Sequence, residues 1–104
     1  MLRALHGAVF KQYDARATTL RDVLSDGRYN CVSSAVVYAG AASELGLAVQ
    51  AELEPTHARV RVKTSTAWVA VETTSPDGFD PPPSAVVEIR RRVAAADPDA
   101  ESIV

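Results

Sequence analysis

Three residues of this chain carry the side chains of a thiol-based catalytic site: Cys31, His57 and Glu72. Cys31 is the only cysteine of the 104 residues, and Asn30 before it is a favoured N-cap. The unpaired N–H groups and the positive dipole end of a first helical turn favour a thiolate over a thiol. A thiolate nucleophile also needs an imidazole that exchanges its proton and an acceptor that fixes the imidazole tautomer. His57 and Glu72 are the candidates for these two roles.

A structural interpretation of Cys31 competes with the catalytic one. Free cysteine is among the most often buried residue types and commonly packs as a small hydrophobic side chain. The protein would then be a scaffold of helices and a hairpin, and the pairing of His57 with Glu72 would be a coincidence. The choice between the two interpretations therefore depends on whether the predicted helices and strands bring the three residues together.

An apolar helix is predicted to begin at Cys31. Residues 31–45 contain no proline and almost no charge, and Gly46 is typical of the position just after a helix C-terminus. This length corresponds to about four turns. Hydrophobic residues cover most of its circumference, which is typical of a helix buried in a core.

The hydrophobic period changes to two after Gly46. Residues 49–54, 57–62 and 67–72 alternate between apolar and polar side chains, which predicts three half-buried strands. Val49, Ala51 and Leu53 would form the buried face of the first strand, and Pro55 and Thr56 interrupt the pattern. A short link at Thr64–Ser65 indicates that the second and third strands form a hairpin.

A loop centred between Thr64 and Ser65 fixes a register for this hairpin. It places His57 directly opposite Glu72, within reach of a hydrogen bond, and Arg61 opposite Trp68 as a cation–π pair. It also keeps the small apolar residues on one face, with the pairs Ala58–Val71, Val60–Val69 and Val62–Ala67. Either the terminal helices cover that apolar face, or a bulge near His57 turns the imidazole toward it.

Further helices are predicted on both sides of this core. Residues 1–13 have the spacing of an amphipathic helix, with His6 on its exposed face. A capping box at Thr19–Asp22 begins a short helix that Gly27 ends. A turn at 75–78 and a proline link at 81–83 lead to a last helix beginning at Ser84, with Arg90–Arg92 on a solvated face. The acidic residues 97–101 are expected to form a frayed tail.

Composition excludes several classes of function. Eleven Lys and Arg against thirteen Asp and Glu give a net charge of -2, which provides no basic field for nucleic acid. One cysteine excludes an internal disulfide. One cysteine with two histidines is a poor ligand set for a structural zinc site, and neither metal nor cofactor is expected. No secretory segment or apolar run of membrane length is present, which predicts a soluble, cytoplasmic chain. The oligomeric state and membership of a longer chain stay open.

The order of these parts resembles the transglutaminase-like superfamily, whose members share a papain-like Cys-His-Asp architecture. The stretches that are similar to the family's cysteine helix, histidine strand and acid strand are YNCVSSAVVYAGAASELGL, THARVRV and WVAVETTSPDGFD. The resemblance spans about residues 20–80 and is to bacterial-type transglutaminase-like domains. It implies an α+β fold, in which a central helix with Cys31 at its N-terminus packs on a small antiparallel sheet with flanking helices. Residues 1–80 would form the domain, followed by the proline link, helix and tail of residues 81–104.

The resemblance implies that Cys31 is the nucleophile, His57 the general base and acid, and Glu72 the group that orients the imidazole. A Cys31 thioester would form on a protein or peptide amide, and water or an amine would resolve it. The Cys31 backbone N–H would be one oxyanion donor, whereas Tyr29 is expected to pack against the helix rather than to be a second. Glu72 departs from the family's commoner aspartate. The alternative function is therefore a catalytically weak or inactive domain that acts as a protein-binding or regulatory module.

Overall fold

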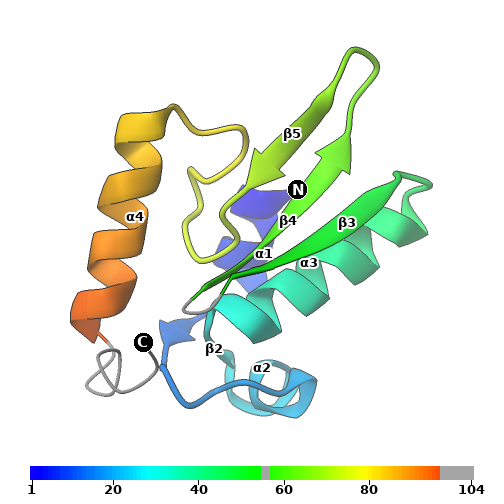
Figure 1. Ribbon diagram of the computed structural model, residues 1–104. Coiled ribbons are helices and arrows are strands. Elements are labelled where there is room, and N and C mark those ends of the chain that lie inside the picture. Colours follow the sequence, from blue (N-terminus) through cyan, green and yellow to red (C-terminus); the bar gives the residue numbers. More distant parts are fainter. Residues whose placement is uncertain (55–56, 97–104) are drawn as a thin grey trace.

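The computed structural model of the protein describes residues 1–54 and 57–96. The described residues form four helices and five strands (Figure 1), in the order α1 (Leu2–Ala8), β1 (Gln12–Tyr13), α2 (Leu20–Asp26), β2 (Arg28–Tyr29), α3 (Cys31–Glu44), β3 (Val49–Glu54), β4 (His57–Lys63), β5 (Trp68–Val71) and α4 (Pro83–Ala96). Strands β3, β4 and β5 form an antiparallel sheet in that order, and β1 pairs with β2 in parallel. The predicted α+β class, with helices around a small antiparallel sheet, is confirmed.

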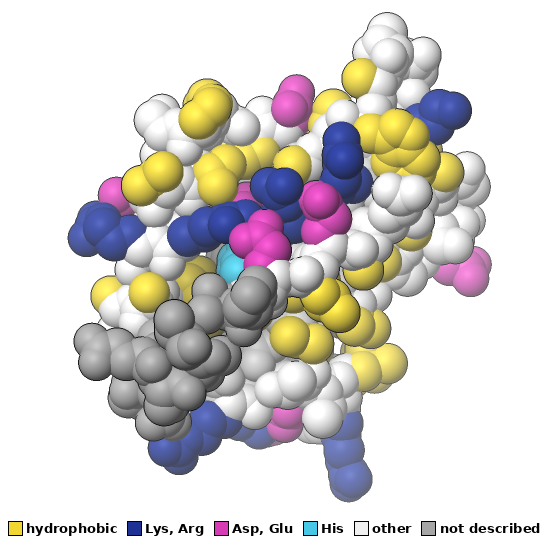
Figure 2. Space-filling model, in the orientation of Figure 1, with side chains coloured by type: hydrophobic (Ala, Val, Ile, Leu, Met, Phe, Trp, Pro, Cys, Tyr) yellow, Lys and Arg dark blue, Asp and Glu magenta, His cyan; other side chains and the backbone are white. Residues whose placement is uncertain are grey.

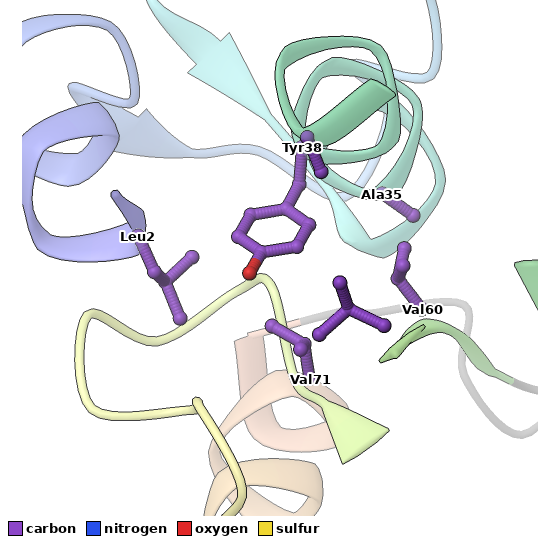
Figure 3. Packing of buried hydrophobic residues seen from close by; sticks show 7 residues of the cluster. Leu2, Ala35, Tyr38, Val60 and Val71 are labelled. Atoms are coloured by element: carbon purple, nitrogen blue, oxygen red, sulfur yellow. The ribbon is translucent and has the colours of Figure 1, made fainter. Parts of the chain in front are cut away.

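Helices α1 and α3 cover one face of the sheet (Figure 1). The ring of Tyr38 extends from α3 between Leu2 of α1 and the sheet residues Val60 and Val71 (Figure 3). Ala35, Ala42 and Val62 complete this buried cluster. The apolar face of the hairpin is therefore covered by the central helix together with the N-terminal helix.

Charged side chains occupy the other face of the sheet, as Figure 2 shows over β3 and β4. The Arg59 Nε donates a hydrogen bond to Glu52 Oε1 at 2.9 Å, and Arg61 Nε lies 4.0 Å from the same oxygen. Arg59 and Arg61 alternate along β4 with the buried Val60 and Val62. Strand β4 is therefore apolar toward α3 and ion-paired on its opposite side.

Strand β3 is less buried than its sequence pattern predicts. Among the described residues it pairs with β4 alone. Val49 packs against the core, whereas Ala51 is exposed and Leu53 is 79% exposed. The prediction of a half-buried strand is therefore wrong at Ala51 and Leu53. Alternation predicts which side chains share a face of a strand, but a covering element must also lie over that face.

The register of the hairpin differs from the predicted one by two residues. The observed pairs are Val60–Val71, Arg61–Ala70, Val62–Val69 and Lys63–Trp68. An offset of two leaves every side chain on the face that the alternation predicted, because the period of a strand is two. The predicted Arg61–Trp68 pair is wrong, since Lys63 takes the position opposite Trp68.

Thr64 is the cause of this shift. Its backbone N–H donates to the carbonyl oxygen of Ala67 at 2.8 Å, and the Ala67 N–H donates to Thr64 Oγ1 at 3.1 Å. These bonds close a loop over residues 64–67, which is centred one residue later than the link at Thr64–Ser65. Each pairing partner on β5 therefore moves two positions along the chain.

The shorter elements agree in part with the sequence patterns. The Thr19–Asp22 capping box and the left-handed Gly27 that ends α2 are confirmed, with φ of 70° at Gly27. Helix α1 ends at Ala8, so the predicted helix over 1–13 is too long, and Tyr13 lies in β1. The parallel pairing of β1 with β2 has no counterpart in the prediction, because two-residue strands are too short to show a period.

Helix α3 follows its prediction closely, since it ends at Glu44 and Gly46 has a φ of 82°. Helix α4 begins at Pro83, one residue before the predicted Ser84. The predicted break at Pro55–Thr56 and the predicted tail at 97–101 lie outside the described residues. Among the described helices, none has the length and apolar character required to cross a membrane.

Candidate active site

Asn30 fixes the first turn of α3. Its Oδ1 accepts hydrogen bonds from the backbone N–H groups of Val32 and Ser33, each at 3.0 Å. Its side-chain amide donates to the carbonyl oxygen of Ala15 at 3.1 Å, and only 6% of the residue is exposed. The cap does not engage the Cys31 N–H, which lies against its own sulfur. The helix N-terminus is therefore held firmly, with one backbone donor beside the thiol.

Replacing Asn30 with alanine is expected to lower the free energy of unfolding by about 2 kcal/mol, the upper end of the range for N-caps, because the buried Ser33 N–H and the partly buried Val32 N–H lose their acceptor. Chemical denaturation measures this loss. Thr19→Ala, which removes the exposed cap of α2, is the matched control and should cost less. Equal losses in the two variants would contradict a special role for the buried cap.

The structure brings Cys31 and His57 together. Cys31 is half-buried, and its sulfur is hydrogen-bonded to the His57 ring and lies beside the backbone N–H of Ala58. His57 is the first residue of β4 and is 8% exposed. The N-terminus of α3 therefore meets the sheet at the end where β4 begins.

His57 also contacts Glu72, as the sequence predicts. Its Nε2 lies 2.7 Å from Glu72 Oε2, and Glu72 is fully buried at 0% exposure. Since Nε2 faces the carboxylate, Nδ1 is the ring nitrogen left for Cys31. The three side chains thus form one hydrogen-bonded series from sulfur to imidazole to carboxylate.

The two partners meet diagonally rather than directly across the hairpin. Continuing the observed register places Glu72 opposite Arg59, just beyond the end of β5, and two positions from His57. Diagonal neighbours on one face are separated by about 7–8 Å, a distance that only long side chains bridge. Strand β4 pairs with β3 in one continuous register from Val62 to His57, without a bulge in the described strands. The alternative in which a bulge turns the His57 imidazole toward the apolar face is therefore not needed.

A tight loop holds the backbone of Glu72. The Glu72 N–H donates to the carbonyl oxygen of Gly78 at 2.8 Å. The next residue, Thr73, links this loop to two helices: its Oγ1 is 2.7 Å from Ser34 Oγ in α3, and its carbonyl oxygen is 2.8 Å from His6 Nε2 in α1. These contacts fix the carboxylate relative to the helix that carries Cys31.

Arg90 is the residue of this site that the sequence analysis missed. Its Nε donates to Glu72 Oε1 at 3.2 Å, and Nη1 and Nη2 donate to Glu54 Oε2 and Oε1 at 2.8 and 3.0 Å. The predicted solvated face is thus wrong for Arg90, while Arg91 and Arg92 do lie exposed and pair with Glu88. A helical stripe cannot reveal which of three adjacent arginines faces a carboxylate in a distant strand.

The electrostatics of the series favour an ion pair of thiolate and imidazolium. Burial raises the pKa of the Cys31 thiol, but the His57 hydrogen bond and charge and the Ala58 N–H together bring it below its ordinary 9. Burial lowers the pKa of His57, yet its bonds to Cys31 and Glu72 outweigh this effect and raise that pKa to about 9. The pKa of Glu72 is raised by burial and lowered more strongly by His57 and Arg90. The imidazole of His57 is therefore protonated at neutral pH.

Other residues considered from the sequence have structural roles. Tyr29 packs edge-on against His6 and Tyr13, which agrees with the packing role predicted for it. His6 is half-buried and its ring packs against Phe10 and Tyr29, so its predicted exposure is wrong. Burial lowers the pKa of His6. Ser33 Oγ donates to the Ala17 carbonyl oxygen and thus supports the cap. Among the described residues, no group of His, Cys, Asp and Glu is arranged to hold a metal ion.

Comparisons with protein-family models, with curated proteins and with solved structures returned no match to this chain.

Proposed function

We propose that this chain is a transglutaminase-like domain with a papain-like arrangement, and that it catalyses acyl transfer or amide hydrolysis on protein or peptide substrates through a Cys31 thioester. The observation that carries the proposal is the hydrogen-bonded series from Cys31 through His57 to Glu72. The three residues come from α3, β4 and the end of β5, elements that are distant in sequence and have no structural need to meet through polar side chains.

The polar contacts of Cys31 support a catalytic role for this residue over a purely structural one. A cysteine that only fills a core sits among apolar side chains, whereas Cys31 is bonded to an imidazole and two backbone N–H groups. Perturbed pKa values of adjacent groups in opposite directions are typical of acid–base and nucleophile pairs. Cys31 and His57 have this property.

The reaction follows from these positions. The Cys31 thiolate attacks the carbonyl carbon, and the oxyanion that forms accepts a hydrogen bond from the Cys31 N–H. The imidazolium of His57 gives its proton to the leaving amine, and the C–N bond breaks to leave a thioester. Water or a second amine then attacks the thioester while His57 accepts its proton, and the departing thiolate restores the ion pair. Glu72 keeps the imidazole in the orientation that these transfers require.

The test is the pH dependence of iodoacetamide alkylation at Cys31, with His57→Ala as its comparison. At pH 6 the natural protein is expected to react faster than the variant, because the lowered pKa of the thiol leaves a larger fraction of Cys31 as thiolate. The acyl-transfer rate should fall above pH 9, where His57 loses its proton. With a glutamine-containing peptide and an added primary amine, both routes release ammonia when the thioester forms. Conversion of glutamine to glutamate then identifies hydrolysis, and a peptide–amine adduct identifies transfer.

A binding or regulatory module is the second candidate. The observation that favours it is the Arg90 contact, since a carboxylate shared with an arginine is also typical of a structural ion pair. An activated thiolate with no turnover on any amide would support this module. Alkylation that follows an ordinary thiol pKa in both proteins would contradict the catalytic proposal, and a thiol that reacts only after denaturation would identify Cys31 as a core residue.

A further inference from the structure

Arg90 joins the C-terminal helix to the carboxylate that faces His57. It is the only one of the three consecutive arginines in α4 that the described contacts place on the sheet; Arg91 and Arg92 pair within the helix with Glu88. Its guanidinium holds Glu72 through Nε and Glu54 through both terminal nitrogens. One side chain thus connects the end of β5 with the end of β3, on either side of β4.

The geometry of Glu72 explains why such a contact matters. Its diagonal offset from His57 requires a long side chain, and glutamate has one more rotatable bond than the aspartate that commonly orients a catalytic imidazole. That bond would let the carboxylate rotate and lose its alignment with Nε2. Because Oε1 is held by Arg90 while Oε2 faces His57, the rotation is restrained from the other side.

Glu54 restrains Arg90 in turn. The paired hydrogen bonds from Nη1 and Nη2 to the two Glu54 oxygens fix the plane of the guanidinium, and only 33% of the Arg90 side chain is exposed. A bidentate arginine contact of this kind has a defined orientation that lysine cannot reproduce. The Nε–H is therefore aimed at Glu72 rather than free to follow solvent.

We propose that Arg90 is a positioning residue of the Cys31 site: it holds Glu72 in the rotamer that orients His57, and thereby makes α4 part of the catalytic unit. This inference rests on the proposed function and adds to it the means by which a glutamate serves in the third position. Arg90 acts through Glu72 and contacts neither substrate nor sulfur.

The experiment compares Arg90→Met, Arg90→Lys and Arg91→Met by the pH profile of Cys31 alkylation, with Glu72→Gln alone and combined with Arg90→Met. At pH 6 the Arg90→Met variant is expected to react about tenfold more slowly than the natural protein, the lower end of the range for groups that orient a ligand or base. Its profile should move to higher pH. Arg91→Met, which removes an arginine from the same helix, should leave the profile unchanged, and Arg90→Lys should recover only part of the rate.

The combined variant identifies the route of the effect. If Arg90 acts through Glu72, Arg90→Met should add little once Glu72 is already glutamine. Independent, multiplicative losses in the double variant would overturn the proposal, as would full recovery by lysine or a profile of Arg90→Met that matches Arg91→Met. Failure of the proposed function is distinguishable from failure of the Arg90 proposal. In the first case the natural protein itself would show no alkylation rate that depends on His57.

Discussion

Replacing Glu72 with alanine is expected to lower the free energy of unfolding by about 3 kcal/mol, at the low end of the cost of breaking a buried ion pair. Glu72 is 0% exposed, and its removal leaves the imidazole of His57 and the Nε of Arg90 without their carboxylate. The loss stays near the low end because His57 can release its proton and Arg90 keeps its bonds to Glu54. Urea denaturation at pH 7 measures the change.

The matched control is Glu88→Ala, which removes an exposed carboxylate that pairs only along α4 among the described contacts. It should have little effect on stability, since exposed ion pairs contribute little. A loss for Glu72→Ala as small as that for Glu88→Ala would show that the buried series is not an important part of the fold. Glu72→Asp should remain destabilised, because the shorter side chain does not span the diagonal offset to His57.

The pH dependence of the free energy of unfolding tests the role of the Glu72 carboxylate by a second measurement. The folded pKa of Glu72 lies below its unfolded value of 4.5, so its stabilisation is present above pH 4.5 and is lost as pH falls through the lower folded value. The Glu72→Gln variant has no group that titrates at this position. Its stability should therefore decline less steeply below pH 4.5 than that of the natural protein, and equal slopes would contradict this assignment.

The three candidate residues could be predicted from the sequence because each depends on local chemistry or on strand parity. Asn30 and Gly46 bound the helix that places Cys31 at its start. His57 and Glu72 share a face under any register that preserves alternation, so a shift of two residues left their pairing possible. The long glutamate then spans the offset that the shift introduced.

The contacts that the sequence did not reveal depend on tertiary placement. The loop closed by Thr64 differs from a two-residue turn through side-chain hydrogen bonds that alternation does not encode. The exposure of Leu53 depends on where α3 lies, and the role of Arg90 depends on how α4 approaches the sheet. A helical period indicates an apolar stripe, but not which charged residue beside it meets a partner.

Replacing Gly78 with alanine is expected to destabilise the protein by about 3 kcal/mol, near the upper end of the usual cost of overpacking. An added Cβ would overlap the carbonyl oxygen of Glu72 and would lie 2.8 Å from its carbonyl carbon and 3.1 Å from its Cβ. These atoms belong to a backbone that is bonded to Gly78 itself, so they cannot move aside as a flexible side chain can. The loop must open, and Glu72 must move with it.

The same change should therefore weaken the site as well as the fold. Alkylation of Cys31 at pH 6, measured at a temperature where the variant is still folded, is expected to slow because the displaced carboxylate no longer orients His57. Gly40→Ala is the control, since a Cβ at that position in α3 meets nothing within 4 Å. It should increase stability by about 0.5–1 kcal/mol through its helix propensity. The same substitution thus has opposite signs at the two glycines, and a Gly78→Ala protein as stable and as reactive as Gly40→Ala would refute the close packing of the 72–78 loop on which the position of Glu72 depends.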